Sequence, residues 1–587
     1  MNEIIIGIDL GTTNSEVAIV EQGKVTVIAD KGNKILASFV GVDESGQIMV
    51  GETARNQYLV YPERTVKSIK RLMGQNTQVK LADQIFTPQE ISAIILKRLK
   101  SIAEDYLHQP VSKAVITVPA YFSDAQRQAT REAGEISGLE VVRMINEPTA
   151  AALVYDSGQV ESKQVLVYDL GGGTFDVSVV NIESGVVEVL SNHGDNQLGG
   201  DDFDQQIINY LLKQLKVNEQ VDARNNSKAM ARLTRAAEDA KRVLSDQPFV
   251  QINEEYLLEH KGESIHLSLE LSRIEYEEMI VDYIDTTMNA VHIALKDAKL
   301  TSSDIEEIIL VGGSTRTPCI RERLFNEFGF EPHGEIDADL CVAMGAAIQA
   351  AMINGQQIDT VLVDVTPYTY GTSAIGTLDG ADYPFVFAPI IHKNSVLPSR
   401  KTESFSTNYH GQEFVDISIY QGEDHDALNN IKIGEFRVEG LQDVKAGNVI
   451  ILTLELDLNG ILQVSAIEKL TGLDKSITIQ NAFSYTESGK LDTAKQRITS
   501  LFGKLDSSLY EQDEDEQEGQ SGVAPEVEKA YQLISKAEGL FTQVSKEDKE
   551  DMSDLIRQIT KCIDSDKTDN LENTVAQLKD IIYYLET

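Results

Sequence analysis

The sequence predicts a multidomain protein in which a two-lobed α/β part precedes a β-sandwich and a C-terminal helical segment. From residue 1 to about 355, short β-branched runs alternate with longer helix-like segments, which is typical of α/β domains. Between about 366 and 480, short strands follow one another with Gly, Asn and Pro turns, as in a β-sandwich. From about 487 onward, segments such as APEVEKAYQLISKAEGLF have the apolar spacing of amphipathic helices.

The 587 residues are enough for two to four domains, and their charge excludes several kinds of partner. Asp and Glu outnumber Lys and Arg by 93 to 52, so the surface repels nucleic-acid backbones and anionic lipids. The chain starts with Glu3 instead of a basic signal-peptide region, and no apolar run approaches the roughly 18 residues of a membrane span. The cysteines, Cys319, Cys341 and Cys562, are too scattered for a disulfide framework or a zinc site. We therefore expect a cytoplasmic protein that binds neither nucleic acid nor membranes.

One sequence unit occurs twice in the α/β part. Residues 4–20 are IIIGIDLGTTNSEVAIV, and residues 166–180 are LVYDLGGGTFDVSVV. In each copy an apolar run leads into Asp, Leu-Gly and a turn of small residues, and a second apolar run follows. Each copy therefore predicts a hairpin, and the repetition predicts that the two halves of the α/β part are related.

The residue types in these turns predict a site for a polyphosphate. Residues without bulky side chains let backbone N–H groups converge on a phosphate, as Gly11, Thr12 and Thr13 can in one turn and Gly171, Gly172, Gly173 and Thr174 in the other. Asp9, Asp169 and Asp176 at the strand ends could organise Mg²⁺ through water. A single glycine-rich hairpin can be merely a tight turn, but duplication with Asp at the matching place favours two halves that hold one nucleotide.

Two further segments are weaker candidates for the same cleft. The segment ILVGGSTRTP, residues 309–318, follows an apolar strand and suits the nucleoside side of such a site. In EDAKRVLS, residues 238–245, the polar side chains share one helical face. Spacing alone favours a charged face exposed to solvent for this helix.

Seven ordered motifs give the chain a resemblance to a known family. They are GIDLGTTNS, VPAYFSDAQRQATREAG, INEPTAAAL, DLGGGTFDVS, GDNQLGGDDFD, LVGGSTRTP and VLVDVTPY. In this order they resemble the DnaK-type seventy-kilodalton heat-shock chaperones. The resemblance covers residues 1 to about 480 well and the tail only in character, and the segments TLDGADYPFVFAPIIHKNSVLP and IYQGEDHDALNNI are similar to the HscC-like branch.

The resemblance implies four parts and an ATP-driven function. Residues 1–355 are expected to form an actin-like ATPase domain that binds ATP or ADP with Mg²⁺, with K⁺ as a further candidate ion. Residues 356–365 would be a linker, residues 366–482 a β-sandwich that binds peptides, and residues 483–587 a helical lid with an acidic loop at about 511–522. The expected function is an ATP-dependent chaperone whose partners are unfolded polypeptides, a J-domain co-chaperone and a nucleotide exchange factor.

The resemblance also assigns roles to individual residues of the ATP site. It implies catalytic roles for Lys70, Glu147, Thr174 and Asp169, and metal roles for Asp9, Asp169 and Asp176. Without the resemblance, Lys70 would be a surface lysine and Glu147 an acid at a helix start. The implied nucleotide contacts are Gly11, Thr12, Thr13, Asn14, Gly171, Gly172, Gly173, Thr174, Gly199, Gly200, Asp201, Glu238, Lys241, Arg242, Ser245, Gly312, Gly313, Ser314, Arg316 and Asp339.

Coupling and peptide-binding residues follow from the same resemblance. The coupling positions are Pro119, Arg127, Arg143 and Asp364, the last in the apolar linker segment VLVDV at 361–365. The peptide groove would be lined by Ile375, Phe405, Val415, Ile417 and Ile419, which in isolation fit the inward face of a sandwich equally well. Thr372 and Asn408 stand where the family usually has apolar residues.

Two other functions stay open at the level of sequence. An actin-fold kinase for a small molecule would also hold ATP between two lobes, but it leaves the apolar linker and the β-sandwich without a role. A nucleotide-gated scaffold for one dedicated partner would use all the parts and hydrolyse little ATP. Stimulation of ATP turnover by apolar peptides excludes the kinase, and stimulation by a J-domain protein excludes the scaffold.

Overall fold

The computed structural model describes residues 3–155, 162–333, 337–356, 358, 360–442, 445–478, 490–515, 555–557, 574 and 579. By their contacts, Met1–Leu505 and Asp506–Thr587 form separate units. Within the described part of the chain, no helix has the length and apolarity needed to cross a membrane.

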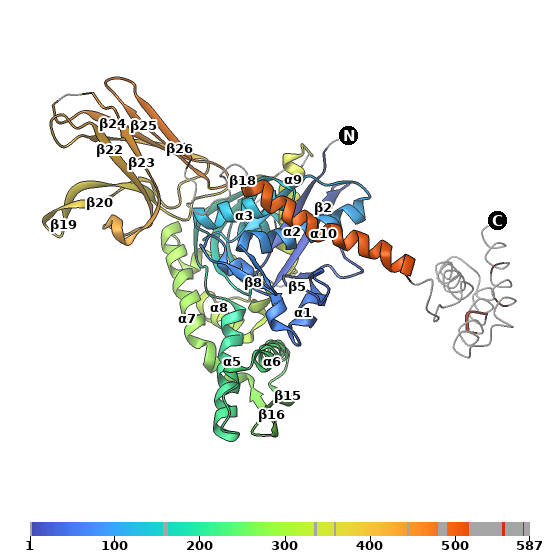
Figure 1. Ribbon diagram of the computed structural model, residues 1–587. Helices are drawn as coiled ribbons and strands as arrows, with labels where there is room; N and C mark the ends of the chain where they lie inside the picture. The colour runs from blue at the N-terminus through green and yellow to red at the C-terminus, as the bar shows by residue number, and fades with distance from the viewer. Residues whose placement is uncertain are drawn as a thin grey trace. The chain divides into compact units, whose positions relative to one another are not determined.

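Two sheets of the α/β part, which is coloured from blue to yellow in Figure 1, share a four-stranded core. In each core, a three-stranded antiparallel meander pairs through its first strand with a parallel strand. In the first sheet, the order is β11 (Glu140–Asn146), β10 (Lys113–Val118), β1 (Ile5–Leu10), β2 (Asn14–Glu21) and β3 (Lys24–Val27), with β4 (Leu36–Ala37) beside β2. The first three strands in this order are parallel, and β2 and β3 continue from β1 as an antiparallel meander. The second has the order β17 (Glu307–Val311), β12 (Lys163–Leu170), β13 (Phe175–Glu183), β14 (Val186–Asp195) and β18 (Val361–Val363). The predicted hairpins and the predicted relation between the two halves are therefore confirmed.

Helices and small sheets surround these two sheets. The first half contains α1 (Glu52–Tyr58), α2 (Pro88–Leu107) and α3 (Asp124–Ile136), with short sheets made of β5 (Val40–Val42), β6 (Ile48–Val50) and β7 (Thr65–Val66), and of β8 (Val79–Leu81) and β9 (Gln84–Phe86). The second half contains α5 (Gly200–Asn218), α6 (Ser227–Asp246), α7 (Arg273–Ala298), α8 (Pro318–Phe328) and the hairpin of β15 (Phe249–His260) and β16 (Glu263–Ser272). Capping boxes start α2, α3 and α7, at Thr87, Ser123 and Ser272, because each side chain accepts the amide hydrogen three residues on.

Small residues join the two large sheets. Helices α4 (Glu147–Tyr155) and α9 (Cys341–Ile353) pack together in one buried apolar cluster with residues of β10, β12 and β13. A Cβ atom at Gly345 would lie 1.9 Å from the carbonyl oxygen of Ala150, and a Cβ atom at Gly7 of β1 would lie 2.1 Å from the amide nitrogen of Ala347. These backbones approach so closely that only glycine fits at both positions.

The C-terminal strands form the predicted β-sandwich. One sheet has the order β20 (Ala381–Ile391), β19 (Tyr370–Leu378), β22 (Phe414–Gln421) and β23 (Ile431–Glu439), and the other has the order β21 (Ser399–Ser406), β24 (Val449–Leu456), β25 (Leu462–Glu468) and β26 (Asp474–Thr478). Alternate residues of both sheets meet in one apolar core, as period-two patterning predicts. The sandwich and the two-lobed α/β part confirm the predicted fold class.

Helix α10 (Lys490–Asp515) corrects one sequence prediction. The acidic stretch was expected to be a loop from about residue 511, but the helix continues to Asp515, and the remainder of the stretch lies outside the described residues. Ala494, Ile498 and Leu501 of α10 are buried in the apolar cluster that includes α2, and the Arg497 guanidinium binds the Glu90 carboxylate at 3.2 Å. The apolar spacing of the first turns of α10 therefore serves this contact.

We expect Gly345→Ala to destabilise the α/β part by about 1–3 kcal/mol, because the added methyl group overlaps the backbone of α4. The measurement is the thermal midpoint of the full chain by circular dichroism. Ile353→Ala is the matched control, because Ile353 ends the same helix and is 42% exposed. Equal midpoints for Gly345→Ala and the wild type would contradict the close packing of α4 against α9.

Candidate functional site

The two glycine turns lie against each other. The first connects β1 to β2, the second connects β12 to β13, and both strand pairs are antiparallel. A Cβ atom at Gly172 would lie 1.9 Å from Oγ1 of Thr13, and one at Gly173 would lie 2.6 Å from Oγ1 of Thr12. Side chains larger than hydrogen at these two glycines would therefore push the turns apart.

Two backbone carbonyls of the second turn accept hydrogen bonds from residues outside the turn. The carbonyl oxygen of Gly171 accepts from Oγ of Ser314 at 2.8 Å and from the amide of Gly200 at 3.0 Å, and that of Gly172 accepts from the amide of Asp201 at 2.7 Å. In contrast, the amides of Gly172 and Gly173, like those of Thr12 and Thr13, have no partner among the described residues. The turns thus retain the donors that a phosphate group requires.

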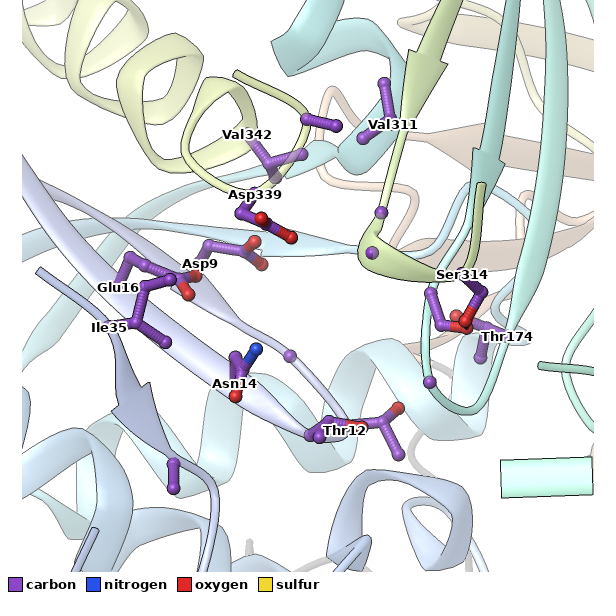
Figure 2. Close-up of a pocket in the computed structure, with 18 of the residues that line it drawn as sticks. Asp9, Thr12, Asn14, Glu16, Ile35, Thr174, Val311, Ser314, Asp339 and Val342 are labelled. Atoms are coloured by element: carbon purple, nitrogen blue, oxygen red, sulfur yellow. The ribbon is translucent and has the colours of Figure 1, made fainter. Parts of the chain in front are cut away.

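A cavity of about 490 Å³ opens at these turns (Figure 2). Most of the predicted nucleotide contacts line it, namely Gly11, Thr12, Thr13, Asn14, Gly171, Gly172, Thr174, Glu238, Lys241, Arg242, Gly312, Gly313, Ser314, Arg316 and Asp339. Asp9, Lys70, Glu147 and Asp169 line it as well. Gly173, Gly199, Gly200, Asp201 and Ser245 do not, and neither does Asp176.

The residues outside the lining have other positions around the site. Gly199 packs directly against the second turn, where a Cβ atom would lie 2.6 Å from the carbonyl oxygen of Gly172. Ser245 is one turn too far along α6, and its hydroxyl donates to the carbonyl of Lys241. Asp176 is buried behind the cavity wall, where it accepts the amide hydrogen of Tyr121 at 3.0 Å.

Lys70 and Glu147 form a buried ion pair beside the turns, with exposures of 4% and 8%. The Lys70 ammonium lies 5.8 Å from the centre of the Phe122 ring. Burial lowers the pKa of Lys70, but the carboxylates of Glu147, Asp9 and Asp169 together outweigh burial and raise it. Lys70 is thus a fixed cation at the cavity, not the surface lysine that its surroundings in the sequence indicate.

Burial raises the pKa values of several acidic side chains in and behind the cavity wall. Burial raises the pKa of Glu147 to about 7 against the opposing effect of Lys70, and raises that of Asp176 to about 7. Burial also raises the pKa of Asp9 and of Asp169, although Lys70 lowers both. Acids with such pKa values in a cavity are typical of a functional site.

Ion pairs line the far side of the cavity, and one of them, between Arg55 and Glu238, joins the two halves. Glu238 of α6 binds Arg55 of α1 at 2.9 Å and Arg242 at 2.5 Å. Arg316 binds Asp339 at 2.6 Å. The helix of residues 238–245 therefore faces the cavity, so the solvent-exposed interpretation that spacing alone favours is wrong for Glu238 and Lys241. Arg242 also lines the cavity, but its side chain stays exposed.

Sequence reasoning missed several lining residues. They are Glu16, Asn33, Ile35, Ala37, Glu52, Arg55, Val311, Ala338 and Val342. Glu16 was recognisable, because period-two alternation within the first repeated unit puts it on the same strand face as Asn14. Burial with nearby Asp9 and Asp339 raises the pKa of Glu16 well above its usual value. Arg55 carries no local signal, because it reaches the cavity only through the contact with α6.

A chain of hydrogen bonds reaches the segment 361–365 from Asn146, the neighbour of Glu147 in the chain. Arg127 donates to Oδ1 of Asn146 at 2.7 Å, and Nδ2 of Asn146 donates to Oδ2 of Asp364 at 2.9 Å. Pro119 accepts the amide hydrogen of Phe122. Nε of Arg143 is buried without a partner in the described part of the chain, and burial lowers the Arg143 pKa against the attraction of Asp364.

The β-sandwich positions separate into exposed and core residues. Ile375 is 62% exposed on β19, and Phe405 and Val415 are partly buried. Ile417 is 6% exposed, and Ile419 is 0% exposed and packs in the sandwich core. The peptide-groove role of Ile419 stays a prediction, because period-two alternation identifies a strand face but not where the core begins along it.

Comparisons with known proteins agree with this geometry. The family model described as "Hsp70 protein" matches residues 5–84 and 75–587. The chain is 41% identical over 589 residues to a protein of Thermotoga neapolitana named "Chaperone protein DnaK", and the alignment covers 99% of this chain and 93% of that protein. The chain belongs to the Hsp70 family, and it is an ATP-dependent chaperone with ATPase activity.

Proposed function

We propose that this chain hydrolyses Mg²⁺-bound ATP between its two lobes and thereby switches its affinity for extended apolar segments of unfolded proteins. One observation carries the proposal. Asn146 and Glu147 are adjacent in the chain, yet Asn146 binds Asp364 of the linker while Glu147 binds Lys70 at the cavity. A change at the phosphate end of the cavity therefore reaches the linker through one peptide unit.

The cavity residues support a hydrolysis that needs no covalent intermediate. The free amides of the two turns bind the phosphates, and Lys70 stabilises the negative charge that develops on the transferred group. Glu147, with a pKa raised by burial to about 7, orients the attacking water and accepts its proton. Thr174 lines the same end of the cavity.

The donors present also fit Mg²⁺. Asp9 and Asp169 line the cavity, and carboxylate oxygens are the ligands that Mg²⁺ prefers. Burial raises the pKa of both acids, and a cation would offset the repulsion between them. Mg²⁺ would be held by these carboxylates through water and would neutralise phosphate charge. Asp176, which lies behind the cavity wall, would contribute only its negative charge to this site. Nothing in the donor set selects K⁺.

The hydrogen-bonded network supports a coupling role for Arg127 and Asp364. Asp364 is buried, and it accepts hydrogens from Asn146, from Thr149 at 3.4 Å and from the Val365 amide at 2.8 Å. The residues just before it form β18, which pairs with β14 at the sheet edge. Release of this edge strand would free the linker from the nucleotide lobes.

The proposed groove for extended peptide is formed by Ile375, Phe405, Val415, Ile417 and Ile419. The Thr372 hydroxyl donates to the carbonyl of Ser418 at 2.8 Å, so it offers no free donor to a client. This departure from an apolar residue therefore keeps the preference for apolar side chains. Backbone recognition with few side-chain contacts gives the weak, broad affinity that a releasing chaperone needs.

The remaining assignments follow from the same proposal. We propose the parts 1–355, 356–365, 366–482 and 483–587 as ATPase domain, linker, peptide-binding domain and lid. A J-domain co-chaperone would act near Arg143, and an exchange factor would open the cavity. The HscC-like branch and a cytoplasmic location are part of the proposal, supported by the long β19–β20 hairpin and by the scarcity of cysteines.

We expect Lys70→Ala to slow single-turnover ATP hydrolysis at least 100-fold, because the cation for the developing charge is lost. ATP binding, measured by calorimetry, should persist, since the turn amides remain. Lys67→Ala is the matched control in the same segment and should hydrolyse at the wild-type rate. A Lys70→Ala rate within tenfold of wild type would rule out the assigned role.

We expect Asp364→Ala to weaken the coupling between nucleotide and peptide binding. The buried side-chain amide of Asn146 would lose its hydrogen-bond acceptor, which costs about 1–3 kcal/mol of stability in this arrangement. The measurement is the stimulation of single-turnover hydrolysis by an apolar peptide, which should fall from its wild-type value to near none. Asp379→Asn, at an exposed hairpin turn, should keep full stimulation. Undiminished stimulation in Asp364→Ala would contradict coupling through Asn146.

We expect Ile375→Asp to weaken binding of a fluorescent apolar peptide about tenfold to a hundredfold, since burial of an Ile side chain contributes about 1.5–3 kcal/mol. Ile431→Asp is the control, because Ile431 is also exposed, 58% against 62%, but lies on β23 outside the proposed groove. Fluorescence anisotropy with ADP measures both. Equal weakening by the two variants would argue against the groove.

A further inference from the structure

Glu16 is a buried acid for which the proposed mechanism has no use. It lies on β2 directly opposite Asp9 of β1 in the antiparallel pair, so both side chains are on one face of the sheet. Glu16 is 2% exposed and lines the cavity, and Figure 2 shows it beside Asp9. Its carboxylate has no hydrogen bond or ion pair within the described part of the chain.

The other acids of the cavity wall are largely compensated. Glu147 pairs with Lys70, Glu238 with Arg55 and Arg242, Asp339 with Arg316, and Glu52 with Arg55 at 3.7 Å. Asp9, Glu16 and Asp169 line the cavity without an ion pair of their own among the described residues. A nucleotide would add further negative charge, and one Mg²⁺ held through water by Asp9 and Asp169 would offset only part of it.

Like charges directly opposite each other in a sheet are destabilising, and an unpaired buried carboxylate is costly. Asp9 retains an acceptor, because Thr117 donates to its Oδ1 only. Two carboxylates on neighbouring strands, with oxygens directed into one cavity, match the oxygen preference of a hard divalent cation. Both observations indicate a ligand of positive charge at this corner.

We propose that Asp9 and Glu16 bind a second divalent cation, which bridges them to the phosphates of the bound nucleotide. This inference rests on the proposed nucleotide site. Among the described residues, no three metal-ligating side chains are grouped closely enough to hold a metal by themselves. Phosphate and water oxygens must therefore complete the coordination, so the second cation binds only when nucleotide is present.

The test counts Mn²⁺ ions bound to the full-length protein with saturating ADP, using the electron paramagnetic resonance signal of free Mn²⁺. We expect two ions per protein in the wild type and one in Glu16→Gln, with the second site weakened at least tenfold. Without ADP, the second ion should be absent from both. Glu52→Gln is the matched control, because Glu52 lines the same cavity but is 56% exposed, and it should bind two ions.

Two further measurements separate a cation site from a structural role. Glu16→Asp keeps the charge and should retain the second ion, with a loss of affinity smaller than that of Glu16→Gln. Without metal or nucleotide, Glu16→Gln should unfold at or above the wild-type temperature, because the repulsion from Asp9 is removed. A lower unfolding temperature together with an unchanged ion count would overturn the proposal.

The remaining outcomes are also decisive. One ion in the wild type with normal ADP uptake by calorimetry overturns this proposal alone, and so does an equal count of two in the wild type and Glu16→Gln. No ADP uptake by the wild type overturns the nucleotide site and this proposal with it.

Discussion

The close approach of two glycine turns is the constraint on which the rest of the site depends. Gly172 and Gly173 allow the second turn to touch Thr13 and Thr12 of the first, and larger side chains would separate them. The carbonyls of Gly171 and Gly172 accept hydrogens from Ser314, Gly200 and Asp201, so the free amides of the turns remain available at one cavity. The contact between the two halves of a repeated unit thus creates the phosphate site and fixes the distance across the cleft.

The proposed signal from the nucleotide site to the linker passes between two residues that are neighbours in the chain. The end of β11 and the start of α4 meet between Asn146 and Glu147, and these neighbours point to different partners. Because Lys70 and Asp364 are both buried, each bond is formed away from water and is sensitive to small displacements. The nucleotide and the linker therefore communicate through one rigid strand end, with Arg127 holding Asn146 from the other side.

Much of this arrangement could be predicted from the sequence, for identifiable physical reasons. The hairpins of residues 4–20 and 166–180 were predictable because strand alternation and turn glycines are local signals. Ser245 lies outside the cavity lining and Ile419 lies in the sandwich core, and neither position was predictable, since a shared helix or strand face does not show where that face leaves the site. Arg55 was not predictable at all, because only the contact between α1 and α6 brings it to the cavity. The end of α10 also escaped prediction, because acidic composition does not by itself stop a helix.

The crossing of α4 and α9 has a consequence for motion between the lobes. Its contact surface consists mainly of Gly345 and of alanines, including Ala150, Ala346 and Ala350, so few branched side chains interlock across it. Helices with interlocked side chains must change rotamers before they slide, whereas nearly smooth helices can shift with little resistance. The contact between α4 and α9 therefore both joins the lobes and allows them to slide against each other. Such sliding would open the cleft for one nucleotide to leave and another to enter.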